Sequence, residues 1–166
     1  MNYRFFAGTG VKVSELAMGT QTWGWVADEK TSHEIADRFV EAGGNFFDTA
    51  NIYNDGASET MLGSWLKKQG NRDRLFISSK VFFSVGDGPN QSGLSRKHML
   101  QSVEESLGRL QTDYIDLYQA HCYDYTARLE ETLQVFSDLV TSGKVRFVGI
   151  SNWLPSQLMK GIQICR

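Results

Sequence analysis

The strongest constraint on the fold is a repeated alternation of short apolar strands with amphipathic helices. Strands are expected at 15–18, 45–48, 75–80, 114–121 and 145–151, after a small hairpin over 3–13. Helices are expected after each strand: from a Thr31-x-x-Glu34 capping-box pattern to Gly43, over 58–68, from Ser95 to Leu110, over 129–140, and from Pro155 onward. Five strand–helix units in succession require parallel strands joined by right-handed crossovers.

Two architectures fit this alternation, a doubly wound open sheet and part of an eight-stranded (β/α) barrel. A dinucleotide-binding open sheet normally has a Gly-x-Gly-x-x-Gly turn after its first strand, and the stretch 19–24 lacks that spacing. A barrel places its functional residues at the carboxyl ends of successive strands, where Asp48, Lys80, His121 and Ser151 stand. We therefore predict an α/β fold: a truncated (β/α)8 TIM barrel of about five βα units behind an amino-terminal β-hairpin.

Composition narrows the function classes. The 166 residues are 41% hydrophobic, enough for one globular core, and the formal net charge of -2 gives no electrostatic case for binding nucleic acid or a membrane. Cys122 and Cys165 lie far apart without ligand spacing, so neither a disulfide framework nor a metal site is expected. The chain shows neither a signal peptide nor an apolar run of about 20 residues. We expect a cytoplasmic protein.

The side chains that follow the strands suggest proton transfer to oxygen. Tyr53, five residues after Asp48, is a phenol and hence a reluctant acid at neutral pH, and an ammonium beside it favours the phenolate. Lys80 supplies the ammonium, and Asp48 holds it charged in a pocket. His121 can donate a hydrogen bond to the same substrate oxygen. Carbonyl reduction fits this set, and because no side chain delivers hydride, a nicotinamide cofactor is implied.

Each of these residues also has a simpler structural interpretation. A buried Asp–Lys pair is often structural, Gly19-Thr20 can be a plain turn, and Ser151-Asn152 can cap the next helix. Trp23 and Trp25 can be packing or an apolar substrate wall. The run Arg96-Lys97-His98 is expected to be a solvated helix face. Only the joint placement at successive strand ends favours a functional site.

Six short stretches, in order along the chain, carry a family resemblance. They are Gly10-Val11-Lys12-Val13-Ser14, Met18-Gly19-Thr20, Phe47-Asp48-Thr49-Ala50-x-x-Tyr53, Ser79-Lys80-Val81, Asp113-Tyr114-Ile115-Asp116-Leu117-Tyr118 and Gly149-Ile150-Ser151-Asn152. Together they resemble the aldo/keto reductases. The runs 93–98 and 151–153 resemble the branch that includes potassium-channel β subunits and bacterial relatives.

The resemblance implies an NADPH-dependent oxidoreductase that reduces small aldehydes and ketones to alcohols. The implied catalytic residues are Tyr53 as general acid, with Asp48, Lys80 and His121. The implied cofactor-binding residues are Gly19, Thr20, Asp48, Ser151 and Asn152. The implied substrate-binding residues are Trp23, Phe82 and His121. The alternative is an NADP-binding regulatory subunit or an inactive truncated form; channel subunits typically carry Asn at the position of His121, which favours the reductase.

The chain departs from the family in length, because such barrels typically need about 250 residues. We expect one incomplete domain, 1–166, without the last three βα units, which by resemblance hold the nicotinamide-stacking aromatic and the adenosine pocket. Weak NADPH binding is expected in consequence. The sequence is interpreted as part of a longer reductase, as a fragment that pairs with a second half, or as a truncated inactive form, the first being favoured. The unpaired sheet edges invite pairing with another chain, for example a homo-oligomer.

Overall fold

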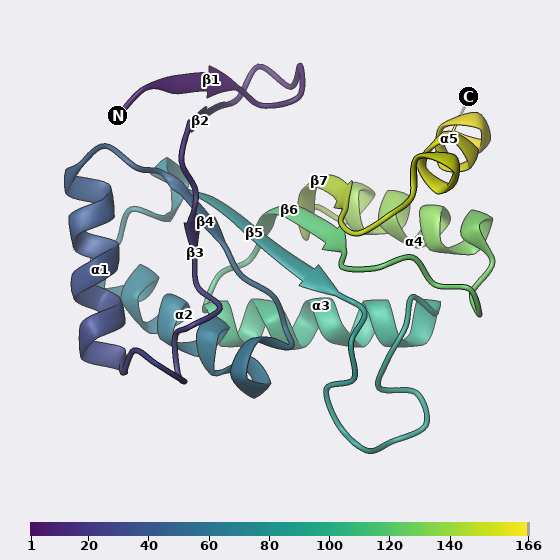
Figure 1. Cartoon of the computed structure of the whole chain (residues 1–166), viewed down its shortest axis with the longest axis horizontal. Helices are drawn as coiled ribbons and strands as arrows, with labels where there is room; N and C mark the ends of the chain where they lie inside the picture. The colour runs from purple at the N-terminus through teal and green to yellow at the C-terminus, as the bar shows by residue number, and fades with distance from the viewer. Residues whose placement is uncertain (166) are drawn as a thin grey trace.

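Five parallel strands form one sheet whose spatial order, β3-β4-β5-β6-β7, repeats their order along the chain (Figure 1). They are β3 (Met18–Gly19), β4 (Phe46–Asp48), β5 (Phe76–Val81), β6 (Ile115–Ala120) and β7 (Val145–Ile150). The computed structural model describes residues 1–165. Because every strand pairs in parallel with its predecessor, the predicted succession of βα units is confirmed.

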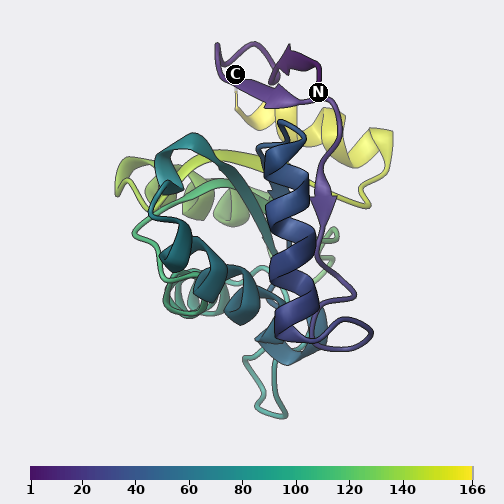
Figure 2. The ribbon, with the colours of Figure 1, turned by 90° about the vertical axis from the view of Figure 1, so that its left-hand side faces the viewer.

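The helices follow one another along the sheet in the same order. They are α1 (Glu29–Glu41), α2 (Ala57–Gln69), α3 (Arg96–Leu110), α4 (Leu129–Thr141) and α5 (Pro155–Ile164), with short 3-10 helices η1 (Tyr53–Gly56) and η2 (Arg72–Arg74). Each α-helix packs on its neighbour in sequence, α1 on α2, then α3, α4 and α5 (Figures 1 and 2). This succession leaves the carboxyl ends of the strands and their loops free to form a site.

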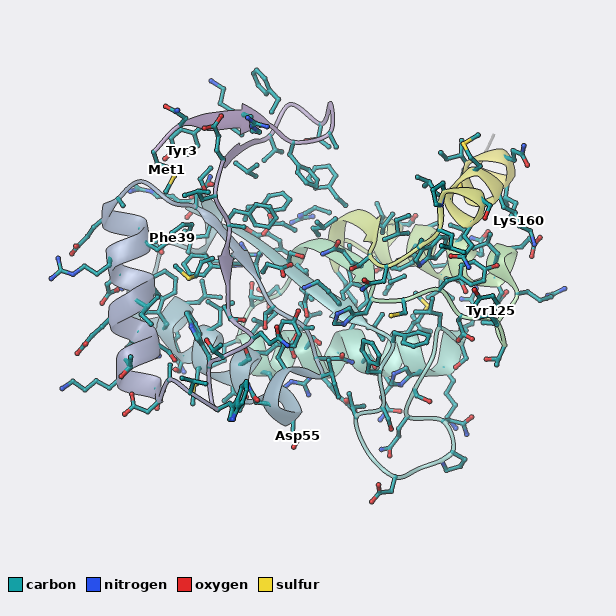
Figure 3. The ribbon with its side chains drawn as sticks, viewed as in Figure 1. Met1, Tyr3, Phe39, Asp55, Tyr125 and Lys160 are labelled. Atoms are coloured by element: carbon teal, nitrogen blue, oxygen red, sulfur yellow. The ribbon has the colours of Figure 1, made fainter. Side chains whose placement is uncertain are left out.

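The core between helices and sheet is built on aromatic contacts. Phe47 in the middle of β4 packs edge-on against Phe39 of α1 (labelled in Figure 3), with ring centroids 5.2 Å apart. Its ring is tilted against that of Trp65 of α2, at 5.1 Å. All six residues of β5 are buried, as expected for a central parallel strand with both faces covered. Burial of these side chains fixes the strands that carry the acid and the lysine of the predicted site.

The amino-terminal hairpin covers the end of the sheet at which the parallel strands begin, opposite their carboxyl ends (Figure 1). Its strands β1 (Tyr3–Phe5) and β2 (Lys12–Ser14) pair antiparallel. Phe6, which follows β1, contacts Phe76 at 4.9 Å and Phe46 at 6.4 Å, the first residues of β5 and β4. The hairpin therefore closes the amino ends of the strands.

One predicted helix start and one predicted strand need correction. Helix α1 begins at Glu29, because the carboxylate of Asp28 accepts a 2.8 Å hydrogen bond from the Thr31 backbone N–H and so caps the first turn. The predicted capping box of Thr31 and Glu34 is therefore wrong, since both residues lie inside the helix. The first barrel strand, expected at 15–18, is confined to Met18–Gly19.

The interpretation of Arg96-Lys97-His98 as a solvated face is also wrong in part. The Arg96 guanidinium bonds Glu131 at 2.5 Å and Asp138 at 2.7 Å, which ties the start of α3 to α4. His98 is buried beside Ser102. Only Lys97 is exposed.

Strands β3 and β7 are the two edges of the sheet. Within residues 1–165, no helix combines the length and apolarity needed to cross a bilayer, and no group of three or more His, Cys, Asp and Glu side chains is arranged to hold a metal ion. The single incomplete domain, 1–166, stays a prediction, and its last residue lies outside the described part of the chain.

Candidate active site

Three of the four residues predicted to be catalytic stand at the carboxyl ends of neighbouring strands. Asp48 is the last residue of β4, Lys80 is the penultimate residue of β5, and His121 directly follows β6. The backbone N–H of His121 still bonds Val81 O at 3.0 Å, so the ladder between β5 and β6 fixes its position. Parallel strands of one sheet bring these ends to the same rim, where the side chains meet.

The Lys80 ammonium connects the set. Its Nζ donates to Asp48 Oδ2 at 2.6 Å, to Thr49 O at 2.9 Å and to the Tyr53 hydroxyl at 3.3 Å. Lys80 is buried, so the carboxylate and the carbonyl replace the water that its charge would otherwise bind. The third hydrogen bond, to the Tyr53 hydroxyl, points the ammonium at the phenol.

The turn that carries Tyr53 is held in a strained backbone conformation. Asn54 and Asp55 directly follow Tyr53 and have φ of 50° and 54°. These values lie in the left-handed region, which residues other than glycine rarely adopt. The Asn54 amide compensates by donating 2.7 Å hydrogen bonds to Gln21 O and Trp23 O. The loop after β3 therefore fixes the turn, and with it the phenol.

His121 completes the group. Its ring packs edge-on against Tyr53, with ring centroids 5.9 Å apart. Burial, followed by the nearby Lys80 charge, lowers the pKa of His121 to about 4, although Asp48 acts in the opposite direction. The imidazole is thus neutral at neutral pH, with one N–H to donate. Its Nδ1 is buried without a hydrogen-bond partner among the described residues.

A cavity of about 520 Å³ opens in front of Tyr53 and His121. Its lining residues are Gln21, Trp25, Ile52, Tyr53, Asn54, Phe83 and His121. Phe83 packs edge-on against His121 at 4.8 Å, and Trp25 is 76% exposed. The cavity thus has aromatic walls around the phenol and the imidazole, which suits an apolar organic ligand.

The aromatic residues at this cavity are not those predicted to face the substrate. Trp23 is only 1% exposed and belongs to the core, whereas Trp25 lies at the cavity. Phe82 packs against the core and lines a neighbouring cavity of about 420 Å³, while Phe83 reaches His121. The structure does not bring Trp23 or Phe82 to the phenol.

No sequence signal separated Trp23 from Trp25, because loop residues lack a fixed period. Nor did one separate Phe82 from Phe83, because β5 ends at Val81 and both residues belong to the loop that follows it. Asn54 and its unusual φ could not have been read from the pattern.

The predicted cofactor residues lie around the same rim. Thr20 is buried, donates to Asp48 O at 3.2 Å and accepts from Ser58 at 2.8 Å, so its side chain supports the acid. Gly19 is exposed, and a Cβ there would meet nothing within 4 Å, which leaves open space at the end of β3. These positions leave room for a ligand beside Asp48.

Ser151 and Asn152 together offer the hydrogen-bond donor and the acceptor that a carboxamide requires. The Asn152 amide nitrogen donates to His121 O at 2.9 Å and to Ser151 Oγ at 3.0 Å. Its side-chain oxygen and the Ser151 hydroxyl proton are left to accept from and donate to a carboxamide. Leu154, not Ser151 or Asn152, occupies the N-cap position of α5, so the capping alternative does not hold. The two residues fit a nicotinamide.

The fold and the rim together define the class of protein. Residues 15–161 match the model of the aldo/keto reductase family, and the chain belongs to that family. Its five βα units and hairpin correspond to part of the family's barrel.

Among the relatives, the chain is 40% identical to "Uncharacterized oxidoreductase YrpG" of Bacillus subtilis, over 96% of this chain and 52% of that protein. It is 35% identical to the aryl-alcohol dehydrogenase (NADP+) of Phanerodontia chrysosporium, over 90% of this chain and 44% of that one. The solved aldo-keto reductase AKR11C1 of Bacillus halodurans (holo form) superposes with a TM-score of 0.87 at 34% identity, over 98% of this chain and 54% of its own. The chain thus spans about half the length of the relatives it matches.

Proposed function

We propose that this chain carries the proton-donating half of an NADPH-dependent reductase that converts aldehydes and ketones to alcohols. The observation that carries the proposal is the position of Lys80 Nζ, within hydrogen-bond distance of both Asp48 and the Tyr53 hydroxyl. An ammonium that is fixed by a carboxylate and directed at a phenol has no evident role in packing. Its positive charge stabilises the phenolate and so helps the phenol to give up its proton.

The geometry supports one role for each of the four residues. Tyr53 donates its hydroxyl proton to the carbonyl oxygen of a substrate in the cavity, on which negative charge develops. The Lys80 ammonium stabilises the phenolate that remains, and Asp48 keeps that ammonium in place. His121, neutral at working pH, donates a hydrogen bond that orients the carbonyl oxygen toward Tyr53.

Ser151 and Asn152 are proposed to hold the carboxamide of the cofactor, with Gly19, Thr20 and Asp48 beside its ribose. Bound at this rim, a reduced nicotinamide supplies hydride to the carbonyl carbon. The choice of NADP(H) is supported by the Phanerodontia chrysosporium relative, which is named an aryl-alcohol dehydrogenase (NADP+). The aromatic walls of Trp25 and Phe83 favour an aromatic or aliphatic aldehyde as substrate.

The test is NADPH oxidation by the chain with 4-nitrobenzaldehyde, compared with the variant Tyr53→Phe. The variant removes one hydroxyl, so turnover is expected to fall by at least about a hundredfold. Cofactor binding, followed by NADPH fluorescence, is expected to stay unchanged. Tyr125→Phe is the matched control, because that phenol is 81% exposed and, among the residues that the structure describes, accepts a hydrogen bond from Gln157 alone.

Equal turnover in wild type and Tyr53→Phe would refute the proton-donor role. Cofactor binding without turnover in either protein would instead favour the regulatory role. Three predictions remain: a single incomplete domain, a homo-oligomer through the edges β3 and β7, and a cytoplasmic location. The mass of the chain in solution tests the homo-oligomer.

A further inference from the structure

Two loops at the rim are joined by one buried carboxylate. The loop after β5 runs over 82–95, and the loop after β6 over 121–128. Asp124, three residues beyond His121, is 8% exposed and lies between them. It takes no part in the proton transfer proposed above, so its burial requires another explanation.

The two oxygens of Asp124 have different tasks. Oδ1 accepts from the Thr126 backbone N–H and hydroxyl, both at 2.7 Å, and from Ala127 N–H at 3.3 Å, which closes a turn within its own loop. Oδ2 accepts a single 2.6 Å hydrogen bond from Leu94 N–H, which belongs to the other loop. These hydrogen bonds lower the pKa of Asp124, although burial acts against them, so the carboxylate is charged at neutral pH.

The loop of 82–95 is shaped to receive this contact. Gly93 has φ of 82°, and a Cβ on it would lie 2.6 Å from Asp124 Oδ2. The Gly93 N–H also bonds Phe82 O at 2.6 Å, which closes the base of the loop. Any side chain at this position would force the carboxylate away from Leu94.

The closed base determines where Phe83 lies. Phe83 is bonded to Phe82, packs edge-on against it at 5.3 Å, and faces His121 at 4.8 Å. Its ring is one wall of the cavity in front of Tyr53. Since Asp124 is anchored three residues after His121, it holds the aromatic wall and the imidazole at a fixed separation.

We propose that Asp124 is a positioning residue that joins the two loops, holds Phe83 against His121, and thereby sets the affinity of the cavity for aromatic carbonyl compounds. The identity of the ligand rests on the proposed function. The link between the loops does not depend on turnover, so the proposed function and the role of Asp124 can fail separately.

The variant Asp124→Asn separates the two oxygens. Its single carbonyl oxygen is needed by the three donors of the turn, which leaves the amide nitrogen facing Leu94 N–H, donor against donor. The turn therefore survives while the link to Leu94 is lost. Thr126→Val is the matched control, because it removes one of the three donors on Oδ1 and leaves Oδ2 untouched.

The first measurement needs no catalysis. Hydrogen–deuterium exchange at the Leu94 amide is expected to accelerate about tenfold or more in Asp124→Asn and to stay unchanged in Thr126→Val. The His121 ring-proton NMR shift is expected to move in the first variant only, because the Phe83 ring leaves its edge. Unchanged exchange and an unchanged His121 resonance in Asp124→Asn would overturn the proposal.

The second measurement concerns the ligand. Affinity for 4-nitrobenzaldehyde, measured by quenching of tryptophan fluorescence, is expected to weaken about fivefold in Asp124→Asn. In turnover, KM for that aldehyde is expected to rise by the same factor with kcat unchanged, while propanal, which has no aromatic ring to pack against Phe83, is expected to show neither change. Equal losses of kcat with both aldehydes would show a general structural role and reject the proposal.

Gly93→Ala gives an independent test from the other loop. Its Cβ displaces Asp124 Oδ2, so the same acceleration at Leu94 and the same selective loss of aromatic affinity are expected. If wild type shows no turnover but the exchange and affinity results hold, the proposed function fails and the role of Asp124 stands. If wild-type turnover is normal and the affinity for 4-nitrobenzaldehyde is unaffected in both variants, the proposed function stands and the role of Asp124 fails.

Discussion

Lys80 donates a 2.6 Å hydrogen bond to Asp48 across the β4–β5 boundary, although only 7% and 31% of the two side chains are exposed. The lysine has lost most of its water, and its counter-charge stands on the neighbouring strand. Removal of one partner of a desolvated pair costs more than the pair itself contributes, because the other charge is left buried. The pair therefore couples stability to the proposed chemistry.

The variant Asp48→Asn is expected to lower the free energy of unfolding by about 3 kcal/mol, at the low end for such pairs because Asp48 is partly exposed. Turnover is expected to fall about a hundredfold, since Lys80 is no longer held toward Tyr53. Urea titration and NADPH oxidation measure the two effects. The double variant Asp48→Asn, Lys80→Met removes the orphaned charge and should recover part of the stability but none of the activity. No recovery of stability would show that the two charges are not coupled.

A second prediction concerns pH. The pKa of His121 falls from the ordinary 6.5 to about 4 in the folded chain. Between these values the unfolded state binds more protons at this site than the folded state, so stability rises with pH in this window and is lost as pH falls from 6.5 to 4. The contribution is on the order of 1 kcal/mol once partial exposure is allowed for.

The check is the melting temperature between pH 4 and pH 7, in wild type and in His121→Gln. The variant lacks the titrating ring and should show a flatter profile across this window. Identical slopes in wild type and His121→Gln would place the titration elsewhere.

A third prediction concerns the ion pair beneath the site. Glu59 of α2 is fully buried and accepts 2.5 Å and 2.8 Å hydrogen bonds from Ser79 and Arg109. Ser79 precedes Lys80 on β5, so this carboxylate connects two helices to the strand that bears the lysine. Glu59→Gln is expected to cost about 3 kcal/mol by chemical denaturation, because Arg109 loses its counter-charge. Exposed Glu130→Gln should stay within about 0.5 kcal/mol, and an equal cost for both would rule out the network.

The grouping of the proposed catalytic residues was predictable from the sequence, because strand ends are encoded locally. Asp48, Lys80 and His121 each follow an apolar run, and parallel topology brings such ends to one rim whatever the loops do. Lys80 Nζ lies 3.3 Å from the Tyr53 hydroxyl, a distance that the proposed proton transfer requires.

The cavity walls were not predictable in the same way. Trp25 rather than Trp23, and Phe83 rather than Phe82, line the cavity at Tyr53 and His121, because the conformations of the loops after β3 and β5 decide which aromatic ring reaches it. Asp124 was missed although Asp-Tyr-Thr is a recognisable Asx-turn pattern. Its partner Leu94 lies 30 residues away, and no local rule identifies such a contact.

The final prediction concerns the crossing of α2 and α3, the two helices that support η1 and β5. A Cβ on Gly63 would lie 2.1 Å from Arg109 O and 2.7 Å from Leu110 C, which are backbone atoms that cannot rotate away. Gly63→Ala must therefore separate the helices, and we expect a loss of at least about 2 kcal/mol in the free energy of unfolding. Gly108→Ala is the matched control on α3, where a Cβ meets nothing within 4 Å. It should instead stabilise the chain by up to about 1 kcal/mol through helix propensity. Thermal denaturation of both variants decides the matter, because opposite signs follow only if contact between the helices, and not the glycine itself, sets the cost.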